Sequence, residues 1–142
     1  MKRIVDIRTL IHCLELFDSS ASIKKISECV DSLGLYAQKL MQNAYNYCVE
    51  CDGQIVGFIS FYANHSDVAF LTLIAVEKSR KGYGIGFGML EHAITVAKEN
   101  GMNHMRLEVH KLNAEAISFY KRNGFVIEFD DGKQSYFMIK EL

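Results

Sequence analysis

The spacing of apolar residues along the first third of the chain predicts two helices. Apolar side chains recur every three or four positions over residues 10–17, which is the period of one helix face, and the polar residues 18–20 close this helix. A second helix is expected over residues 32–44. A short alternation over residues 3–7 indicates a strand ahead of the first helix, whereas residues 20–31 show no readable period.

Between residues 45 and 76 the pattern changes to short β-rich runs separated by turn residues. Strands are predicted over residues 45–51 and 54–63, because these runs flank Asp52-Gly53, a strong short hairpin signal. The turn at residues 64–67 leads into a third strand over residues 68–76. This third run is almost continuously apolar, as expected for a central strand covered by helices on both faces. We therefore expect a three-stranded antiparallel meander.

The second half of the chain alternates helices and strands. An apolar stripe over residues 84–100 predicts an amphipathic helix, which Asn100-Gly101 ends. The elements expected after it are a strand, a helix and two further strands at residues 105–110, 113–123, 125–129 and 136–139. The strand–helix–strand order from residue 70 to residue 109 predicts one right-handed parallel crossover. The expected fold class is mixed α/β (α+β), with a mixed, mostly antiparallel central sheet and helices on both faces.

Composition narrows the class of protein. Hydrophobic residues make up 49% of the chain and charged residues 23%, and no linker or repeat marks a boundary, so a single domain is expected over residues 1–142. Sixteen basic and seventeen acidic side chains give a net charge of -1, which offers no general attraction for nucleic acid or an anionic membrane. No stretch approaches the roughly 20 apolar residues of a membrane span. We expect a cytoplasmic monomer or homodimer with no nucleic-acid or membrane partner.

The cysteines do not suggest a disulfide framework. Cys13, Cys29, Cys48 and Cys51 are few and unevenly spaced, which suits a reducing compartment. Cys48 and Cys51 do have the C-x-x-C spacing of half a zinc site or of a redox pair. However, no second pair with metal-ligand spacing exists, and residues three apart in a strand point to opposite faces. We expect two packed thiols and no metal.

Four glycines follow the central strand where the long helix begins. They are Gly82, Gly84, Gly86 and Gly88. Backbone without side chains lets several N–H groups converge on an anion at a helix N-terminus, where the helix dipole adds partial positive charge. Lys78, Arg80 and Lys81 precede them, against one carboxylate, Glu77. The spacing fits neither a dinucleotide fingerprint nor a Walker loop. We therefore expect the loop to bind a pyrophosphate compound that is recognised by neither of these two motifs. The alternative is that the glycines only permit close packing of the helix on the strand.

The loop and the segment after it resemble the GNAT superfamily, the Gcn5-related N-acetyltransferases. The acetyl-CoA loop of that family reads Gln/Arg-x-x-Gly-x-Gly/Ala after an apolar strand, and residues 81–86, Lys-Gly-Tyr-Gly-Ile-Gly, align with it. Lys81 departs from the family's arginine or glutamine but keeps a positive charge. A second block is similar to the family pattern L-x-V, N-x-x-A-x-x-x-Y-x-x-x-G-F. It comprises Leu107-Glu108-Val109, Asn113, Ala116, Phe119-Tyr120 and Gly124-Phe125. The resemblance covers roughly half of the chain at motif level.

The resemblance implies acetyl-CoA as co-substrate and a GNAT-like acyl-CoA acyltransferase fold. In such a fold the strands at residues 71–76 and 105–109 separate, and the pantetheine arm of the cofactor lies between them. Its amides form hydrogen bonds with the main-chain groups that the separation leaves unpaired. An N–H of Ile74 or a neighbour would polarise the thioester carbonyl. The cofactor-binding residues implied in this way are Leu73, Ile74, Ala75, Val76, Lys81, Gly82, Tyr83, Gly84, Ile85, Gly86, Asn113 and Tyr120.

The resemblance also implies catalytic roles for two residues. Tyr120 matches the family tyrosine whose hydroxyl reaches the CoA sulfur as general acid, while its ring packs on the sheet. Glu108 lies twelve residues earlier, similar to the basic glutamate of the ribosomal-protein alanine N-acetyltransferases. It would accept the amine proton directly or through water, unless it is an ion-paired strand residue beside Arg106 and His110. Asn113 matches a family position that contacts the cofactor; capping of the last helix would also explain an asparagine there, and the two roles are compatible.

Taken together, these features predict acetyl transfer from acetyl-CoA to a primary amine of a small metabolite, aminosugar or peptide. His65, His110 and Tyr62 are weaker candidates for the base, because such residues near strand ends are more often structural or solvated. The carboxylates of Asp67 and Glu50 are weaker still. An idle acyl-CoA-binding module and a nucleotide-binding enzyme are the alternatives. The acceptor is not identified, because the helices and turns that would select it carry no motif.

Overall fold

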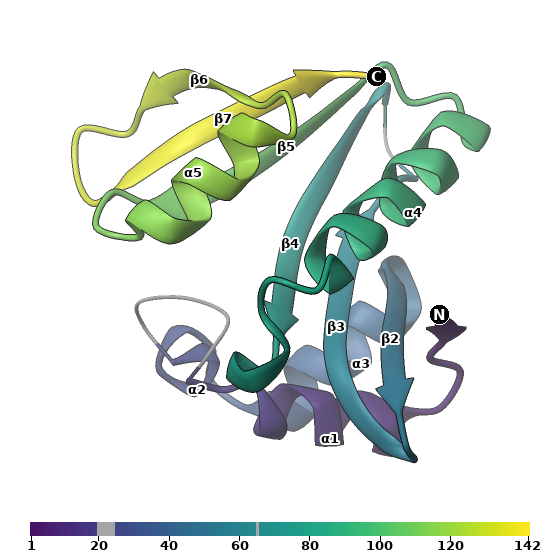
Figure 1. The fold of residues 1–142 in the computed structure, drawn as a ribbon. Coiled ribbons are helices and arrows are strands. Elements are labelled where there is room, and N and C mark those ends of the chain that lie inside the picture. The colour runs from purple at the N-terminus through teal and green to yellow at the C-terminus, as the bar shows by residue number, and fades with distance from the viewer. Residues whose placement is uncertain (20–24, 65) are drawn as a thin grey trace.

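In the computed structural model, which describes residues 1–19, 25–64 and 66–142, the strands form one seven-stranded sheet (Figure 1). The strands are β1 (Lys2–Arg3), β2 (Tyr45–Cys51), β3 (Gln54–Tyr62), β4 (Val68–Val76), β5 (His104–His110), β6 (Val126–Asp130) and β7 (Ser135–Glu141). Their order across the sheet is β1-β2-β3-β4-β5-β7-β6. All neighbouring strands are antiparallel except β4 and β5, which are parallel. The predicted mixed, mostly antiparallel sheet is confirmed.

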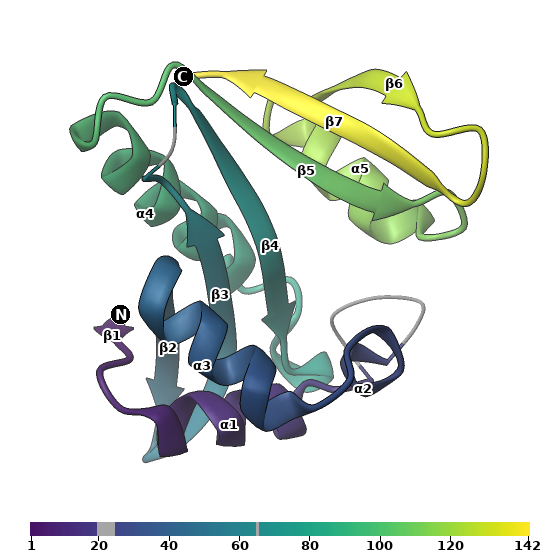
Figure 2. The ribbon, with the colours of Figure 1, turned by 180° about the vertical axis from the view of Figure 1, so that it is seen from behind.

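Helices cover both faces of this sheet, as predicted. The helical elements are α1 (Ile7–Leu16), α2 (Ile26–Cys29), α3 (Leu33–Asn43), the 3₁₀ turn η1 (Lys78–Arg80), α4 (Ile85–Glu99) and α5 (Ala114–Arg122). Figures 1 and 2 show α4 and α5 on one face, and α1 and α3 on the other, behind β2–β4. The face of β5, β7 and β6 opposite α5 has none of these helices over it (Figure 2). Within the described residues no helix is long and apolar enough to span a membrane.

The N-terminal strand is shorter than the alternation at residues 3–7 predicts. It ends at Arg3, because Asp6 caps α1: its Oδ1 accepts a hydrogen bond of 2.9 Å from the main-chain N–H of Thr9. An aspartate in this position satisfies one of the free N–H groups of the first turn. The helix therefore begins at Ile7, ahead of the apolar stripe that predicts it. Helix α2 lies in the segment without a readable period, of which residues 20–24 lie outside the described residues.

Each face of the sheet has its own apolar core. On the α4 side, Met89 and Leu90 pack with strand residues such as Ile59 and Leu107. On the other side, the core contains Leu10, Leu14, Phe17, Leu40, Phe58 and Ala75. Helix α4 sits very close to β3, since a Cβ on Gly57 would lie 3.0 Å from Ile85 Cγ2 and 3.2 Å from the thioether of Met89. A side chain at Gly57 would therefore push the start of α4 away from the sheet.

Candidate functional site

Strands β4 and β5 are paired over only half of their length. Their register runs from Val68 opposite His104 to Leu71 opposite Leu107 and stops there. Beyond that point β4 stays paired with β3 up to Val76, and β5 stays paired with β7 up to His110. The two strands therefore diverge, as Figure 1 shows, and leave facing edges with unpaired main-chain groups. The expected splay is present.

A β-bulge in β4 coincides with the point of divergence. Ser60 lies opposite Leu73, but Phe61 lies opposite Leu71, so Thr72 is an extra residue in β4. Leu73 packs in the core on the α1 and α3 side, and Thr72 lies beside Tyr36 of α3 on the same side. A bulge bends its strand and increases the twist. We therefore attribute the separation of β4 from β5 to the extra residue at Thr72.

The gap between the diverging strands is a cleft of about 640 Å³. Its walls include Glu108 and eleven of the residues predicted to bind the cofactor. These eleven are Leu73, Ile74, Ala75, Val76, Lys81, Gly82, Gly84, Ile85, Gly86, Asn113 and Tyr120. Tyr83 is not part of the wall: its side chain is 79% exposed, which leaves its main chain for any contact in the cleft. Helix α5 contributes Ala116 and Phe119 to the opposite wall.

The glycine loop presents the start of α4 to the cleft. Gly82 and Gly84 have φ values of 89° and 81°, in the left-handed region that favours glycine. Gly84 is the N-cap of α4 and supplies no side-chain hydrogen bond to it. Among the described residues, no side chain caps the first N–H groups of α4, and these groups lie beside the cleft, an arrangement that suits an anion.

Cationic side chains also line the cleft. Arg80 and Lys81 line it, as does Arg122 from the last turn of α5. Lys81 Nζ lies 2.9 Å from Glu115 Oε1 in the first turn of α5. Lys78, the third cation of the sequence motif, does not line this cleft. Arg122 is not part of the sequence motif, because its position depends on how α5 packs and not on its distance along the chain from the loop.

Tyr120 is both packed and available to a ligand. Its ring is 8% exposed and lies between Phe119 and Phe125, with centroid separations of 5.5 and 5.7 Å. Burial raises the pKa of the Tyr120 phenol, with no contribution from a hydrogen bond to a described residue. The hydroxyl is therefore protonated at neutral pH and has no partner among those residues.

Glu108 occupies the middle of β5 and lines the cleft. The ion-paired alternative would require Arg106, but that guanidinium binds Glu128: Nε lies 2.7 Å from Oε1 and Nη2 lies 2.9 Å from Oε2. The Nδ1 atom of His110 accepts a hydrogen bond of 3.1 Å from the N–H of Leu112. Among the residues that the structure describes, Glu108 thus has no ion-pair partner.

Asn113 caps α5, as predicted. Its Oδ1 accepts a hydrogen bond of 3.2 Å from the N–H of Ala116. The same side chain lines the cleft, so its contact with a cofactor stays a prediction.

The weaker candidates for a base lie away from the cleft wall or have other roles. Tyr62 lies near Tyr36 on the other core, and burial raises the pKa of its phenol. Asp67 accepts hydrogen bonds from Asn103, and Glu50 lies 3.2 Å from Lys2. His65 lies outside the described residues.

The cysteines and other potential metal ligands form no metal cluster in the described part of the chain. Cys48 is buried and Cys51 half-buried, and all four cysteines are free thiols. In β2 these two residues belong to a strand, not to a ligand loop.

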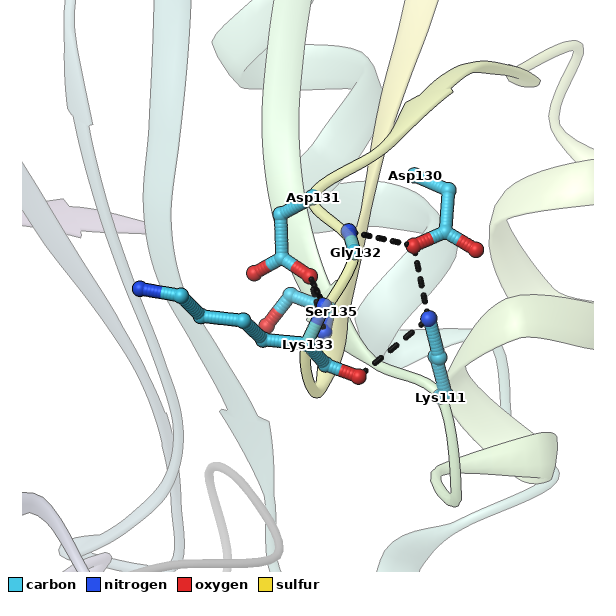
Figure 3. Close-up of polar contacts among 6 residues, drawn as sticks. All are labelled: Lys111, Asp130, Asp131, Gly132, Lys133 and Ser135. Atoms are coloured by element: carbon cyan, nitrogen blue, oxygen red, sulfur yellow. Dashed lines mark hydrogen bonds and ion pairs between the residues drawn. The ribbon is translucent and has the colours of Figure 1, made fainter.

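The turn between β6 and β7 is held against the start of the β5–α5 loop (Figure 3). Asp131 Oδ1 accepts hydrogen bonds of 2.7 and 3.1 Å from the N–H groups of Lys133 and Ser135. Lys111 Nζ lies 2.6 Å from Asp130 Oδ1 and donates a hydrogen bond of 3.2 Å to the main-chain oxygen of Lys133. These contacts fix the hairpin beside the open end of the splay.

Comparison with known proteins adds a family to this geometry. A family model described as "Acetyltransferase (GNAT) family" matches residues 11–125. Streptothricin acetyltransferase of Streptomyces lavendulae is 37% identical over 78 residues, which are 54% of this chain and 41% of that protein. Spermidine N(1)-acetyltransferase of Thermoplasma acidophilum is 35% identical over 83 residues, which are 57% of this chain and 50% of that protein. The chain thus spans about half the length of the curated relatives it matches.

Solved structures share the fold over most of the chain. The PaiA N-acetyltransferase from Thermoplasma acidophilum, in complex with coenzyme A, is 25% identical, with a TM-score of 0.77 over 96% of this chain and 93% of that one. The ribosomal-protein-S18-alanine N-acetyltransferase from Escherichia coli is 21% identical, with a TM-score of 0.78 over 99% of this chain and 92% of that one.

Proposed function

Because the chain belongs to the GNAT acetyltransferase family, we propose that it transfers an acetyl group from acetyl-CoA to a primary amine. The observation that carries the proposal is one cleft that joins an anion-binding loop, an unpaired strand edge, a free glutamate and a tyrosine hydroxyl. Glu108 acts as the base and Tyr120 as the acid.

Acetyl-CoA is bound by the loop and the splayed strands. The first N–H groups of α4 receive the pyrophosphate, with Arg80 and Lys81 supplying positive charge. The pantetheine amides lie along residues 72–76, whose main chain lacks a strand partner on the β5 side. The similar PaiA N-acetyltransferase structure is a complex with coenzyme A, which supports a coenzyme A compound as the ligand. The reaction uses no metal.

Transfer proceeds by direct attack of the amine. The amine nitrogen bonds to the thioester carbon while Glu108 takes one proton from nitrogen. A main-chain N–H near Ile74 stabilises the oxyanion of the tetrahedral intermediate. The carbon–sulfur bond then breaks, and Tyr120 donates its proton to the departing thiolate. The products are the acetylated amine and CoA with a free thiol, and solvent returns both side chains to their starting protonation states.

The acceptor belongs to a broad class: a small metabolite, an aminosugar or a peptide. The names of relatives include streptothricin, spermidine and peptidyl-lysine acetyltransferases, so relatives differ in what they acetylate. We place the activity in the cytoplasm, in keeping with four free thiols.

The decisive experiment is a CoA-release assay over a panel of primary amines, with calorimetric titration of acetyl-CoA alongside. We expect binding and amine-dependent release of CoA. Tight binding of acetyl-CoA without transfer to any metabolite amine, aminosugar or peptide N-terminus would favour the idle acyl-CoA-binding module. Stabilisation by ATP or NAD but not by CoA would favour a nucleotide enzyme.

A further inference from the structure

The face of β5, β7 and β6 opposite α5, called here the open face, places two aromatic rings beside Glu108. Directly paired residues of antiparallel strands point to the same face. Glu108 lies opposite Phe137, and Phe137 lies opposite Phe129. The two rings stack with centroids 4.6 Å apart and planes at 14°, and Phe129 is 47% exposed. Glu108 thus has an accessible apolar platform next to it.

A second β-bulge adds a carboxylate to this face. Ile127 lies opposite Met138, but Phe129 lies opposite Phe137, so Glu128 is an extra residue in β6. Glu128 binds Arg106 of β5, and Phe129 stacks on Phe137. Both side chains therefore point to the open face. The bulge in β4 likewise puts Thr72 and Leu73 on one side of the sheet.

The carboxylate of Glu128 already binds the guanidinium of Arg106, which would otherwise be free to bind a carboxylate of a substrate. Arg106 is bound through both nitrogens of its fork, at 2.7 and 2.9 Å, which is the bidentate geometry that carboxylates prefer. Glu141, opposite His104 in β7, adds a further acidic group to this face. The amine of Lys133, on the β6–β7 turn, extends away from the hairpin (Figure 3), and the residue is exposed. It offers a single ammonium group and not a guanidinium that could bind a carboxylate through two nitrogens.

From this arrangement we infer that the acceptor is a primary amine without a carboxylate, whose apolar arm lies over Phe137 and Phe129 while its nitrogen lies at Glu108. The inference rests on the proposed function for the role of Glu108. An α-carboxylate would stand beside the nitrogen, close to Glu108 and Glu128, with Arg106 already bound. Its desolvation and the like charges would both disfavour binding.

A matched set of three amines tests the inference. Phenethylamine, phenylalanine and phenylalaninamide share a ring and a primary amine but differ in the carboxylate. With rates expressed per concentration of neutral amine, we expect kcat/KM for phenylalanine to be at least about tenfold below that for phenethylamine. Phenylalaninamide should match phenethylamine within about threefold. If phenylalaninamide is as poor as phenylalanine, bulk and not charge sets the preference, and the inference is wrong.

Binding provides a readout that does not depend on turnover. Calorimetry on the protein saturated with CoA should give a Kd for phenethylamine at least about tenfold below that for phenylalanine. If no amine is acetylated but this preference holds, the proposed transfer fails, while the inferred preference of the open face for amines without a carboxylate stands. If phenylalanine binds or reacts as well as phenethylamine, the acceptor inference fails while acetyl transfer is unaffected.

Two substitutions on one strand localise the effect. Glu128→Gln removes the charge that holds Arg106 and should narrow the kcat/KM gap between phenethylamine and phenylalanine by about tenfold. Asp130→Asn breaks the ion pair with Lys111 near the ring of Tyr136, which lies opposite Val109 on the α5 side of the sheet. In this control the ratio of kcat/KM for phenethylamine to kcat/KM for phenylalanine should stay at its wild-type value. An equal decrease of this ratio in both variants would contradict a role for Arg106.

Discussion

Lys81 and Glu115 join the two walls of the cleft, with Lys81 Nζ 2.9 Å from Glu115 Oε1. The lysine belongs to the glycine loop and the glutamate to the first turn of α5. An anion bound at the loop would therefore compete with a carboxylate for the same ammonium group. Exposed ion pairs contribute little to stability, so the pair matters more for ligand binding than for the fold.

Glu115→Gln should tighten the binding of acetyl-CoA. The substitution releases Lys81 and removes a negative charge from the mouth of the cleft, so we expect Kd to fall about two- to fivefold. Calorimetry at low and moderate salt measures the change, which should shrink as salt screens the charges. Glu99→Gln, at the far end of α4, is the control. Weaker binding by Glu115→Gln would show that the carboxylate helps to hold the ligand.

Glu108→Gln should abolish most of the transfer without affecting the donor. Loss of a general base costs about 10²–10⁴-fold in rate, and glutamine keeps the shape of the side chain. We expect kcat/KM to fall by about 10²-fold or more, with the Kd of acetyl-CoA within about twofold of wild type. Glu91→Gln, exposed on α4, serves as the control. A variant with wild-type turnover would move the base to another residue or to water.

Tyr120→Phe should lower kcat and leave the fold intact. The ring keeps its contacts with Phe119 and Phe125, while the proton for the thiolate is lost. We expect a fall in kcat of about 10²-fold at neutral pH and little change in Tm or in the Kd of acetyl-CoA. Steady-state kinetics with a good acceptor measures it. Unchanged kcat at neutral and at high pH would leave Tyr120 with a packing role alone.

Gly84→Ala and Gly88→Ala form a matched pair within the glycine motif. Gly84 has φ of 81°, where a side chain costs about 1–2 kcal/mol, so its variant should lower Tm and weaken acetyl-CoA binding. Gly88 lies inside α4 with no atom within 4 Å of an added Cβ, so alanine there should stabilise by about 0.5–1 kcal/mol. Thermal unfolding and calorimetry test both. Equal effects at the two positions would contradict a special role for the Gly84 backbone.

Alkaline pH should destabilise the fold through Cys13. Burial, helped by the nearby Cys48 thiol, raises the pKa of the Cys13 thiol to about 12, whereas a cysteine thiol in the unfolded chain has a pKa of about 8.5. Above that lower value the unfolded state loses the proton while the folded state keeps it, so the free energy of unfolding falls as pH rises. Cys13→Ala should make this decline shallower between about pH 9 and about pH 11. Urea unfolding measures it, with the exposed Cys29→Ala as a control that keeps the wild-type slope.

Local patterns predicted most of the elements, because their signals lie within a few residues. Asp52-Gly53 is an example: both residues have positive φ, as a two-residue hairpin of this type requires. The N-terminal strand was the main error. The cap formed by Asp6 overrides the alternation at residues 3–7.

The features that shape the site depend on register between distant strands, which no residue type marks. Thr72 is an ordinary strand residue until its pairing with β3 makes it the extra one. Glu128 binds Arg106 from 22 positions away, and only the order β5-β7-β6 brings them together. The splay itself was expected from the family resemblance and not from the residues alone.

In the proposed reaction, the separation of β4 from β5 would also divide the site by the kind of atoms that contact each substrate. Along residues 72–76 it exposes main chain, which nearly every side-chain substitution leaves unchanged, so mutational drift there should disturb the donor little. The inferred acceptor site on the open face would instead depend on the side chains of Glu108, Phe129 and Phe137, each of which a single codon change can replace. If the proposed transfer holds, a change of acceptor in evolution would leave the binding of the donor intact.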